Sequence, residues 1–426
     1  MRWLYSLLLY LITPYLLARL WWRARRLPAY RQRIAERFGY YPAYYPSPMK
    51  SIKKCIWVHA VSVGETVVAE PIIQALIARY PDFSIVVTTM TPTGAARVKQ
   101  VLGDSVIHAY LPYDFPGAVK RFLQTMQPQW GVIIETELWP NLLMTCQQRA
   151  IPMCLLNARL SARSARGYQR ISTLTAAMLR SFAVIAAQSP ADAKRLIDLG
   201  ALPDRVQVTG NLKFDIEVSA DVMSEAVRLR QILGQQRFIW IAASTHAGEE
   251  EIILAAHQLL RVSCPSALLI LVPRHPDRFD AVMKLSEQTF ATVRRSQQTQ
   301  CTEETAVYLA DTMGELILLY GVADVAFVGG SLVARGGHNL LEPAALAKPL
   351  LSGPHVFNFS DISARLNANQ ALGYVTDAAS LAAQLRVFCD DADRREQWGE
   401  RAKQVVMDNR GALKKQLEIL MRITMR

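Results

Sequence analysis

The sequence lacks the residue patterns with which many proteins hold a metal ion or a disulfide framework. Its six cysteines are scattered, and none of them forms a C-x-x-C pair. Neither the H-E-x-x-H zinc motif nor the lysine-containing phosphate loop of Walker A proteins occurs. Scattered cysteines are typical of reduced core thiols, so we expect a reducing compartment and no zinc site. We therefore expect a reaction that needs neither a metal nor a cofactor.

Acidic residues are in the minority. The chain carries 48 Lys and Arg against 36 Asp and Glu, which leaves a net charge of +12. Such an excess favours an anionic partner, namely nucleic acid, an acidic membrane surface or a phosphorylated substrate. Nucleic acid is disfavoured because the basic residues are not interleaved with aromatic residues on a repeating surface. At 426 residues with 51% hydrophobic content, the chain is globular and long enough for more than one domain.

Charge is nearly absent from residues 3–22, which read WLYSLLLYLITPYLLARLWW. This apolar run is long enough to span a bilayer, and five arginines come after it within eleven residues. No small-residue cleavage site appears, so a removable signal peptide is not expected, and the arginines place the remainder of the chain in the cytoplasm. Pro14 and Arg19 interrupt the run, so a helix lying in the membrane interface is an alternative, and burial in the protein's own core is another. We predict that residues 1–30 form a membrane-associated helix.

Two segments of the chain resemble each other. Residues 56–65 and residues 239–249 each form an apolar strand, a small polar loop that ends in Gly-Glu, and the start of an amphipathic helix. Short apolar strands between helical patterns fill the rest of both halves (84–89, 105–110, 131–135, 153–157, 184–188, 206–209, 267–272, 292–294, 325–328 and 349–351). This alternation predicts an α/β protein with two Rossmann-like, doubly wound domains. We place them at residues 31–214 and 215–426, with a hinge at 210–215.

Glycines gather where the apolar strand 324–328 ends, in Gly329-Gly330-Ser331 and again at 336–337. Glycine allows a close approach of backbone to ligand, and the helix start after these glycines offers free N–H groups to an anion. Glu342 could accept hydrogen bonds from ribose hydroxyls. The pattern predicts a nucleotide cradle. The alternative is that Asn339 and Glu342 form a capping box and the glycines only make a turn.

Carboxylates come after two strands of the first half. Glu65 lies where a strand becomes a helix, a position that faces the ligand crevice, and burial would raise its pKa enough for a general base. The alternative is that Ser62 and Glu65 form a capping box. Glu135 and Glu137 end the next apolar strand, and one of them could hydrogen-bond Glu65; a solvated loop is the alternative. Lys213 could stabilise a developing anion or be merely exposed.

Basic and polar residues come after other strands. The segment 157–166 contains three arginines and suits a phosphate or carboxylate, although a solvated basic face explains it equally well. Arg274 ends the strand LLILVP and is placed for an anion, on the edge where His246 is also expected. Residues 311–316 open another helix whose amides could meet a phosphate or a base, unless Asp311 is a plain N-cap.

Ten motifs, taken together and in order, resemble one family. They are HAVSVGE, ETELWPN, NARLS, GNLKFD, ASTHAGEE, PRHPDRF, DTMGEL, FVGGSL, GGHNLLEPA and SGPHVFNF, and they cover nearly the whole chain. In this combination the chain resembles the bacterial 3-deoxy-D-manno-octulosonic acid (Kdo) transferases of lipopolysaccharide synthesis. The resemblance implies the GT-B fold, in which two Rossmann-like domains face a cleft. It implies transfer of Kdo from CMP-Kdo to lipid IVA, without a metal, at the cytoplasmic face of the inner membrane.

The resemblance also implies roles for individual residues. Glu65 would be the general base that takes the proton of the 6′-hydroxyl, and attack would invert the anomeric carbon and expel CMP. Glu135 and Lys213 resemble residues that stabilise the transition state. The CMP site would consist of Pro273, Arg274, Met313, Gly314, Glu315, Asn339, Leu340, Leu341 and Glu342. Residues 31–214 would then bind the acceptor, and residues 215–426 would bind CMP-Kdo.

Other functions fit the residues without the resemblance. A UDP-sugar transferase of the membrane surface and a sugar-nucleotide epimerase would both use two Rossmann-like domains. A membrane-anchored nucleotide-binding module without catalytic activity belongs to a different class. Mutation of Glu65 separates these functions, because a pure binding module would keep its ligand affinity.

Overall fold

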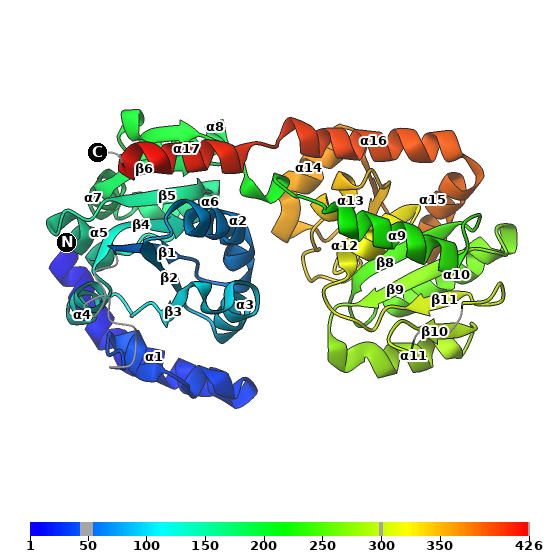
Figure 1. Cartoon of the computed structure of the whole chain (residues 1–426), viewed down its shortest axis with the longest axis horizontal. Coiled ribbons are helices and arrows are strands. Elements are labelled where there is room, and N and C mark those ends of the chain that lie inside the picture. Colours follow the sequence, from blue (N-terminus) through cyan, green and yellow to red (C-terminus); the bar gives the residue numbers. More distant parts are fainter. Residues whose placement is uncertain (43–53, 298–300, 425–426) are drawn as a thin grey trace. The chain divides into compact units, whose positions relative to one another are not determined.

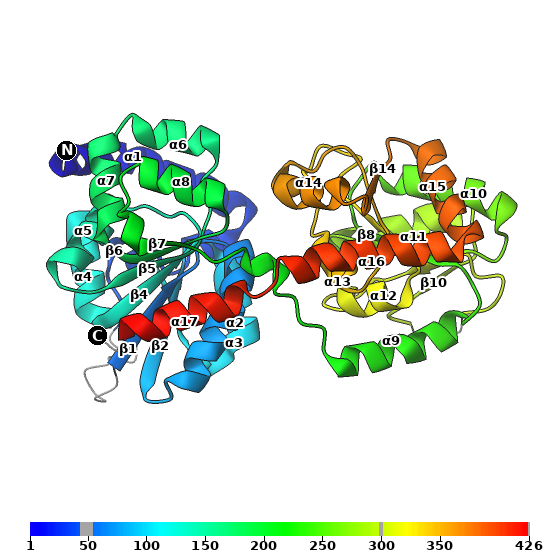
Figure 2. The same ribbon diagram turned by 90° about the horizontal axis from the view of Figure 1, so that it is seen from above.

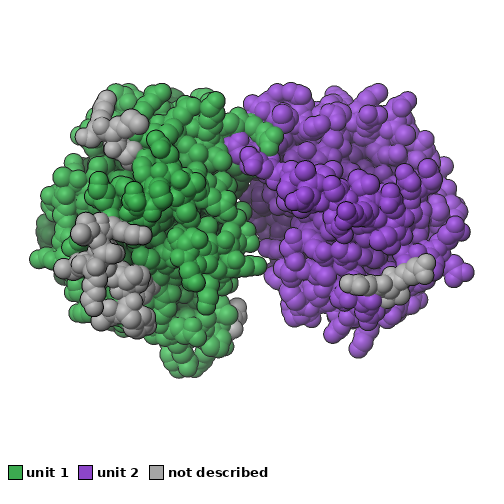
Figure 3. Space-filling model, viewed as in Figure 1, with its two compact units in different colours: residues 1–213, 410–426 green, residues 214–409 purple. Residues whose placement is uncertain are grey.

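A computed structural model describes residues 1–42, 54–297 and 301–424 of the chain (Figure 1). The chain divides into two compact units, which Figure 3 shows in different colours. Unit 1 comprises residues 1–213 and 410–426, and unit 2 comprises residues 214–409. Each unit is an α/β structure with its own seven-stranded sheet.

The sheet of unit 1 is parallel throughout, with the strand order β3-β2-β1-β4-β5-β6-β7. The order reverses between β1 and β4, and ligands of doubly wound proteins bind at such a switch point, beyond the carboxyl ends of the strands. The strands are β1 Lys54–His59, β2 Phe83–Thr89, β3 Ile107–Tyr110, β4 Pro128–Ile134, β5 Met153–Ala158, β6 Phe182–Ala187 and β7 Val206–Val208.

Helices cover both faces of this sheet, which is why its strands are apolar at nearly every position. Alternate residues of β1 point to opposite faces, so that Cys55 and Trp57 belong to one buried cluster and Ile56 and Val58 to another. The helices of unit 1 are α1 Arg2–Arg26, α2 Val63–Arg79, α3 Pro92–Leu102, α4 Pro116–Met126, α5 Pro140–Gln148, α6 Ala162–Gln169, α7 Ser172–Ser181, α8 Pro190–Asp198 and α17 Ala412–Thr424.

The last helix of the chain, α17, belongs to unit 1 and lies beside α2 (Figure 2). Ala412, Ile419 and Leu420 join the buried cluster of β1 and α2, and the buried Gln416 Nε2 donates to Thr209 Oγ1 at 3.0 Å. The expectation that the second domain runs to residue 426 is therefore wrong for residues 410–426. Their apolar side chains complete the core of unit 1, which the local sequence does not reveal.

The sheet of unit 2 repeats this plan with the parallel order β10-β11-β9-β8-β12-β13-β14. Its switch point lies between β8 and β12. The strands are β8 Ile239–Thr245, β9 Leu268–Pro273, β10 Thr292–Arg294, β11 Val307–Leu309, β12 Val325–Val328, β13 Leu350–Ser352 and β14 Leu372–Tyr374. The predicted pair of Rossmann-like, doubly wound sheets is thus confirmed.

The core of unit 2 also has two layers, because Ile239 and Ile241 of β8 lie in one buried cluster and Trp240 and Ala242 in the other. The helices that supply the remaining side chains are α9 Ala220–Leu233, α10 Glu250–Ser263, α11 Phe279–Glu287, α12 Leu316–Val322, α13 Leu341–Ala345, α14 Ser360–Ala368, α15 Ala378–Asp390 and α16 Ala392–Asp408.

Helix α1 is apolar and long enough to cross a membrane, and little of it is buried. Its first turn nevertheless makes polar contacts with α5: Arg2 Nε donates to Asn141 Oδ1 at 2.8 Å, and Arg2 also donates to Thr145 Oγ1 at 2.9 Å. Near its other end Leu20 and Ala24 are buried. The alternative that α1 is a core helix is wrong, because most of its large apolar side chains are exposed.

Candidate active site

Glu65 lies at the switch point of unit 1, in the first turn of α2 just after β1. Its carboxylate accepts a hydrogen bond from Val61 N at 2.6 Å and another from Ser62 Oγ at 3.2 Å. Ser62 precedes α2 but does not cap it, because its hydroxyl donates to Glu65 and accepts no backbone N–H of the helix. The capping-box interpretation of Ser62 and Glu65 is therefore wrong.

The pKa of Glu65 is raised to about 7. Burial is the main cause, and the negative charges of Glu135 and Glu137 add to it, while the Val61 N–H partly opposes the shift. A carboxylate with a pKa near neutrality can accept a proton from a hydroxyl far better than an ordinary glutamate can. Glu65 thus stays a candidate base.

Glu135 comes directly after β4, the strand on the other side of the same switch point. Its carboxylate lies 3.4 Å from Lys213 Nζ, so the structure brings together two of the residues that the sequence singles out. Its backbone has a φ of 61°, which is uncommon for a residue with a side chain. Such a conformation costs about 1–3 kcal/mol and is found most often at functional sites.

Glu137 has a different environment. It accepts a hydrogen bond from Trp139 Nε1 at 2.9 Å, and burial raises its pKa. Only Glu135 of the two forms an ion pair with Lys213 among the described residues. The geometry therefore makes Glu135, and not Glu137, the partner of the Lys213 ammonium.

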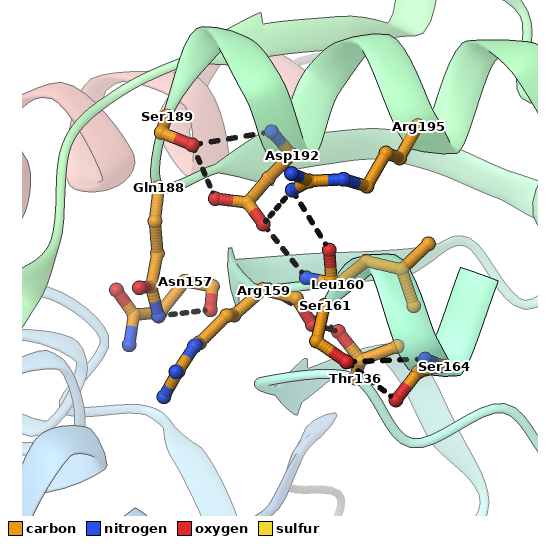
Figure 4. A network of polar contacts seen from close by, with 10 residues as sticks. All are labelled: Thr136, Asn157, Arg159, Leu160, Ser161, Ser164, Gln188, Ser189, Asp192 and Arg195. Carbon is orange, nitrogen blue, oxygen red and sulfur yellow. Dashed lines mark hydrogen bonds and ion pairs between the residues drawn. The ribbon is translucent and has the colours of Figure 1, made fainter. Parts of the chain in front are cut away.

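Asn157, near the end of β5, holds the segment that carries Lys213. It is fully buried, has a φ of 53°, and its Oδ1 accepts from Leu212 N at 3.0 Å. Figure 4 shows it beside Gln188, whose amide donates to the Asn157 carbonyl at 2.9 Å. The sequence pattern indicates Asn157 only as part of a basic loop. Its place at the end of a buried strand is the signal from which its role in holding the segment of Lys213 could have been inferred.

The rest of that loop is held by short polar contacts. Thr136 Oγ1 hydrogen-bonds the carbonyl of Arg159 and accepts from Arg159 N at 3.2 Å, and Asp192 accepts from Leu160 N at 2.9 Å (Figure 4). The guanidinium of Arg159 extends away from this network and makes no hydrogen bond or ion pair within the described ranges. An exposed cation on a fixed backbone is suited to an anionic group.

At the switch point of unit 2, the glycine-rich loop after β12 has a different role from the one that the sequence predicts. The carboxylate of Glu249, which is fully buried, accepts from Gly330 N at 2.7 Å, and from Ser331 N and Leu332 N at 2.9 Å each. It also accepts from His246 N at 2.9 Å. These three loop amides are occupied by an internal carboxylate, so the predicted nucleotide cradle would depend on the helix start at residues 339–342.

Histidine and arginine side chains gather at this edge instead. The rings of His246 and His338 are nearly parallel, with their centroids 5.1 Å apart and their Nε2 atoms 2.9 Å apart. His275 lies with its ring centroid 5.4 Å from that of His246. Arg274, directly after Pro273 at the end of β9, is exposed and lowers the pKa of His338 by its charge. This edge therefore offers positive charge and N–H donors to an anion.

Asn339 and Glu342 lie near Arg274. Burial raises the pKa of Glu342, and the charge of Arg274 opposes this shift. Asn339 Nδ2 donates to Glu342 Oε1 at 3.0 Å, and Asn339 Oδ1 accepts from Leu341 N at 3.1 Å. These contacts do not form a capping box, because α13 begins after Leu340 without a side-chain cap. Leu340 and Leu341 are buried, so only their backbone could meet a ligand.

Met313, Gly314 and Glu315 precede α12. Met313 is exposed, Gly314 has a φ of 87°, and the Glu315 carboxylate pairs with Arg295 at 2.8 Å. Arg295 holds the pKa of Glu315 below its usual value. Asp311 accepts from Ser296 N at 2.9 Å and does not cap α12, whose N-cap is Glu315.

Comparison with known proteins assigns the chain to a family. The family model described as 3-Deoxy-D-manno-octulosonic-acid transferase (kdotransferase) matches residues 32–216, and a model of group 1 glycosyl transferases matches residues 237–405. A 3-deoxy-D-manno-octulosonic acid transferase of Haemophilus influenzae is 43% identical over 422 residues, covering 98% of both chains. The chain belongs to the Kdo transferase family. A transferase of the same name from Bordetella pertussis is 36% identical over 98% of both chains.

Solved structures agree on the fold of this Kdo transferase family member. A UDP-GlcNAc 2-epimerase from Neisseria meningitidis covers 87% of this chain and all of its own, with 13% identity and a TM-score of 0.59. A glycosyltransferase from Rickettsia africae covers 87% of this chain with 14% identity and a TM-score of 0.55. The two Rossmann-like units are thus those of a GT-B glycosyltransferase.

The predicted site residues of this Kdo transferase are distributed over both units. Glu65, Glu135 and Lys213 belong to unit 1, and the nine residues expected to bind CMP belong to unit 2. Within the parts of the chain that the structure describes, no group of three or more acidic, histidine or cysteine side chains is arranged to hold a metal ion.

Proposed function

We propose that this protein transfers Kdo from CMP-Kdo to the 6′-hydroxyl of the distal glucosamine of lipid IVA, with inversion and without a metal. The observation that carries the proposal is the environment of Glu65. It combines a pKa of about 7 with a place at a topological switch point, beside the Glu135–Lys213 pair. The family assignment supplies the class of sugar.

In the proposed reaction the ionised Glu65 accepts the proton of the acceptor hydroxyl. The hydroxyl oxygen forms a bond to the anomeric carbon of Kdo while the bond from that carbon to the phosphate oxygen breaks. The electron pair leaves with CMP, and attack from the opposite face inverts the configuration. Proton transfer to a positioned base of this kind contributes about 10²–10⁴ in rate.

The Glu135–Lys213 pair is proposed to stabilise the transition state. The lysine ammonium, held 3.4 Å from Glu135, is a cation that can compensate negative charge as it develops during the transfer. The strained backbone of Glu135 and the buried amide of Asn157 fix both partners before substrate arrives. Such preorganisation avoids a reorganisation cost during the reaction.

Unit 2 is proposed to bind CMP-Kdo. Arg274 is exposed at the carboxyl end of β9, where it can pair with the phosphate, and Glu342 could accept hydrogen bonds from the ribose. Asn339 orients Glu342 through the 3.0 Å hydrogen bond between their side chains. Pro273, Met313, Gly314, Glu315 and the backbone of residues 340–341 complete the proposed CMP site.

Helix α1 is proposed to lie in the interface of the inner membrane, with the catalytic units on its cytoplasmic side. Its first turn is hydrogen-bonded to α5, and Leu20 and Ala24 near its other end are also buried. A helix of 25 residues, about 37 Å long, cannot place its ends on opposite sides of a bilayer while both ends are packed on the protein. Its exposed tryptophans and leucines, with the arginines after them, suit the surface of a membrane that holds a phosphorylated lipid.

One reaction tests the whole proposal. Purified protein is incubated with CMP-Kdo, lipid IVA and EDTA, and CMP release and the mass of the lipid are measured with Glu65→Ala alongside. We expect the lipid to gain one or more Kdo residues with the wild-type protein and none with the variant. CMP binding without any transfer to lipid IVA would overturn the donor or acceptor assignment, and loss of activity in EDTA would overturn metal independence.

A further inference from the structure

The histidine pair at the switch point of unit 2 is held in place by the loops beside it. The same Glu249 oxygen accepts from His246 N at 2.9 Å and from Gly330 N at 2.7 Å, so one carboxylate joins the two loops beside the pair. Gly330 has a φ of 68°, and a Cβ atom there would lie 2.9 Å from the His338 ring. Only glycine therefore fits at this position while the pair is in place.

The geometry of the pair limits its protonation. The two Nε2 atoms are 2.9 Å apart, so one must carry the hydrogen of the bond and the other must accept it. A pair that shares one hydrogen in this way is neutral, and one further proton on an outer Nδ1 would make it a cation. The pair can therefore take up charge without breaking the contact between its rings.

Several charged groups face the pair. Arg274, Arg335 and His275 disfavour a proton on His246, and Glu249 favours it. Burial is the main cause that lowers the pKa of His338, to about 4, and Arg274, His246 and His275 act in the same direction. Burial likewise lowers the pKa of His246. Without a ligand the pair is thus neutral at pH 7. A bound anion would offset the charge of the arginines and raise the pKa of the pair, so that the pair would gain a proton.

We propose that His246 and His338 form a phosphate-binding site that takes up a proton when the phosphate of the donor nucleotide binds. This inference rests on the proposed function, since it assigns the phosphate of that donor to one part of unit 2. The proton completes a cation beside Arg274, so that two positive groups face the phosphate. The alternative source of negative charge is the carboxylate of the sugar.

Calorimetry of CMP binding to the full protein at pH 7.5, in buffers with different ionisation enthalpies, measures this proton directly. We expect a measurable fraction of a proton to be taken up per CMP, because a nearby anion raises the pKa of a histidine by about one or more units. Cytidine, which lacks the phosphate, should bind without uptake. If a proton is taken up with free Kdo but not with CMP, the pair binds the sugar carboxylate, and the phosphate assignment is overturned.

Variants assign the proton to the pair. His246→Gln and His338→Gln should each remove the uptake and weaken CMP binding about tenfold, while cytidine affinity stays constant. His355→Gln, at an exposed histidine of the same unit, is the control and should bind CMP as the wild type does. CMP binding without proton uptake in the wild type would overturn the inference and leave the proposed function intact. Absence of CMP binding by the wild type would overturn the proposed function itself.

Discussion

Glu65 and Glu249 occupy corresponding places in the two units and have opposite environments. Each comes directly after a glycine that follows the first strand of its half of the chain, at the switch point of its sheet. Glu65 is half-buried, with one backbone N–H and one hydroxyl as its hydrogen-bond donors. Glu249 is fully buried and accepts from four backbone N–H groups.

The difference shows that position in the fold does not by itself decide what a carboxylate does. Four N–H donors hold the Glu249 carboxylate in place and exclude ligand from it, so it fixes the loops of the proposed nucleotide site. Glu65 has fewer donors and two carboxylates nearby, so burial leaves its charged form poorly stabilised. The carboxylate of a base must keep acceptor capacity for one more hydrogen, whereas that of a structural anchor is saturated by its donors.

The largest effect is expected for kcat when Glu65 is changed. Glu65→Gln keeps the size and one acceptor oxygen but cannot take a proton, so kcat should fall about 10³-fold. The thermal midpoint should change little, because no fully buried contact is lost. Glu70→Gln, on the same helix and paired with Arg97, is the matched control and should retain full activity. A Glu65→Gln variant within tenfold of the wild type would show that the two glutamates do not differ as we describe.

Glu249→Ala should instead reduce stability. It leaves four backbone N–H groups, two of them fully buried, without their acceptor, which should cost about 3–5 kcal/mol of unfolding free energy in chemical denaturation. The exposed neighbour Glu251→Ala should change that free energy by less than about 0.5 kcal/mol. If Glu249→Ala unfolds like the wild type but loses transfer activity alone, Glu249 acts in catalysis and the contrast with Glu65 fails.

The fold was predictable because parallel strands covered on both faces are apolar throughout, a signal that the local sequence carries. The strands Thr292–Arg294 and Val325–Val328 agree with the prediction residue for residue. The strands β11 and β14, of three residues each, were missed. Their pairing is set by neighbouring strands far away in the sequence.

The candidate site was predictable in part for the same reason. Glu65, Glu135 and Lys213 were found because each comes after a strand or marks the hinge, and the structure pairs two of them. The internal partner of the glycine-rich loop was missed, since Glu249, which accepts from its amides, lies 81 residues before Gly330. Sequence patterns identify N–H groups that could bind an anion, but only the fold shows whether a side chain has already bound them.

A smaller effect is expected at Asn157, which supports the first site as Glu249 supports the second. Asn157→Ala removes the acceptor for Leu212 N and loosens the segment that carries Lys213. We expect kcat to fall about tenfold with the KM for CMP-Kdo unchanged, because the altered group acts in unit 1 only. Ser161→Ala, in the same loop, changes only contacts within α6 and should leave kcat unaltered. A rise in KM without a fall in kcat would contradict this positioning role.

The smallest expected effect is a shift in pH dependence. The base must be ionised, so kcat/KM should rise with pH through a limb near pH 7, where Glu65 titrates. The negative charge of Glu135 raises the pKa of Glu65, so Glu135→Gln should move this limb to lower pH by about half a unit even as it lowers the maximum rate. Glu137→Gln should move it in the same direction by less, since its charge is the weaker influence. A limb that stays in place in both variants would mean that burial alone sets the pKa of Glu65, and the two switch points would then differ in their hydrogen-bond donors and not in their neighbouring charges.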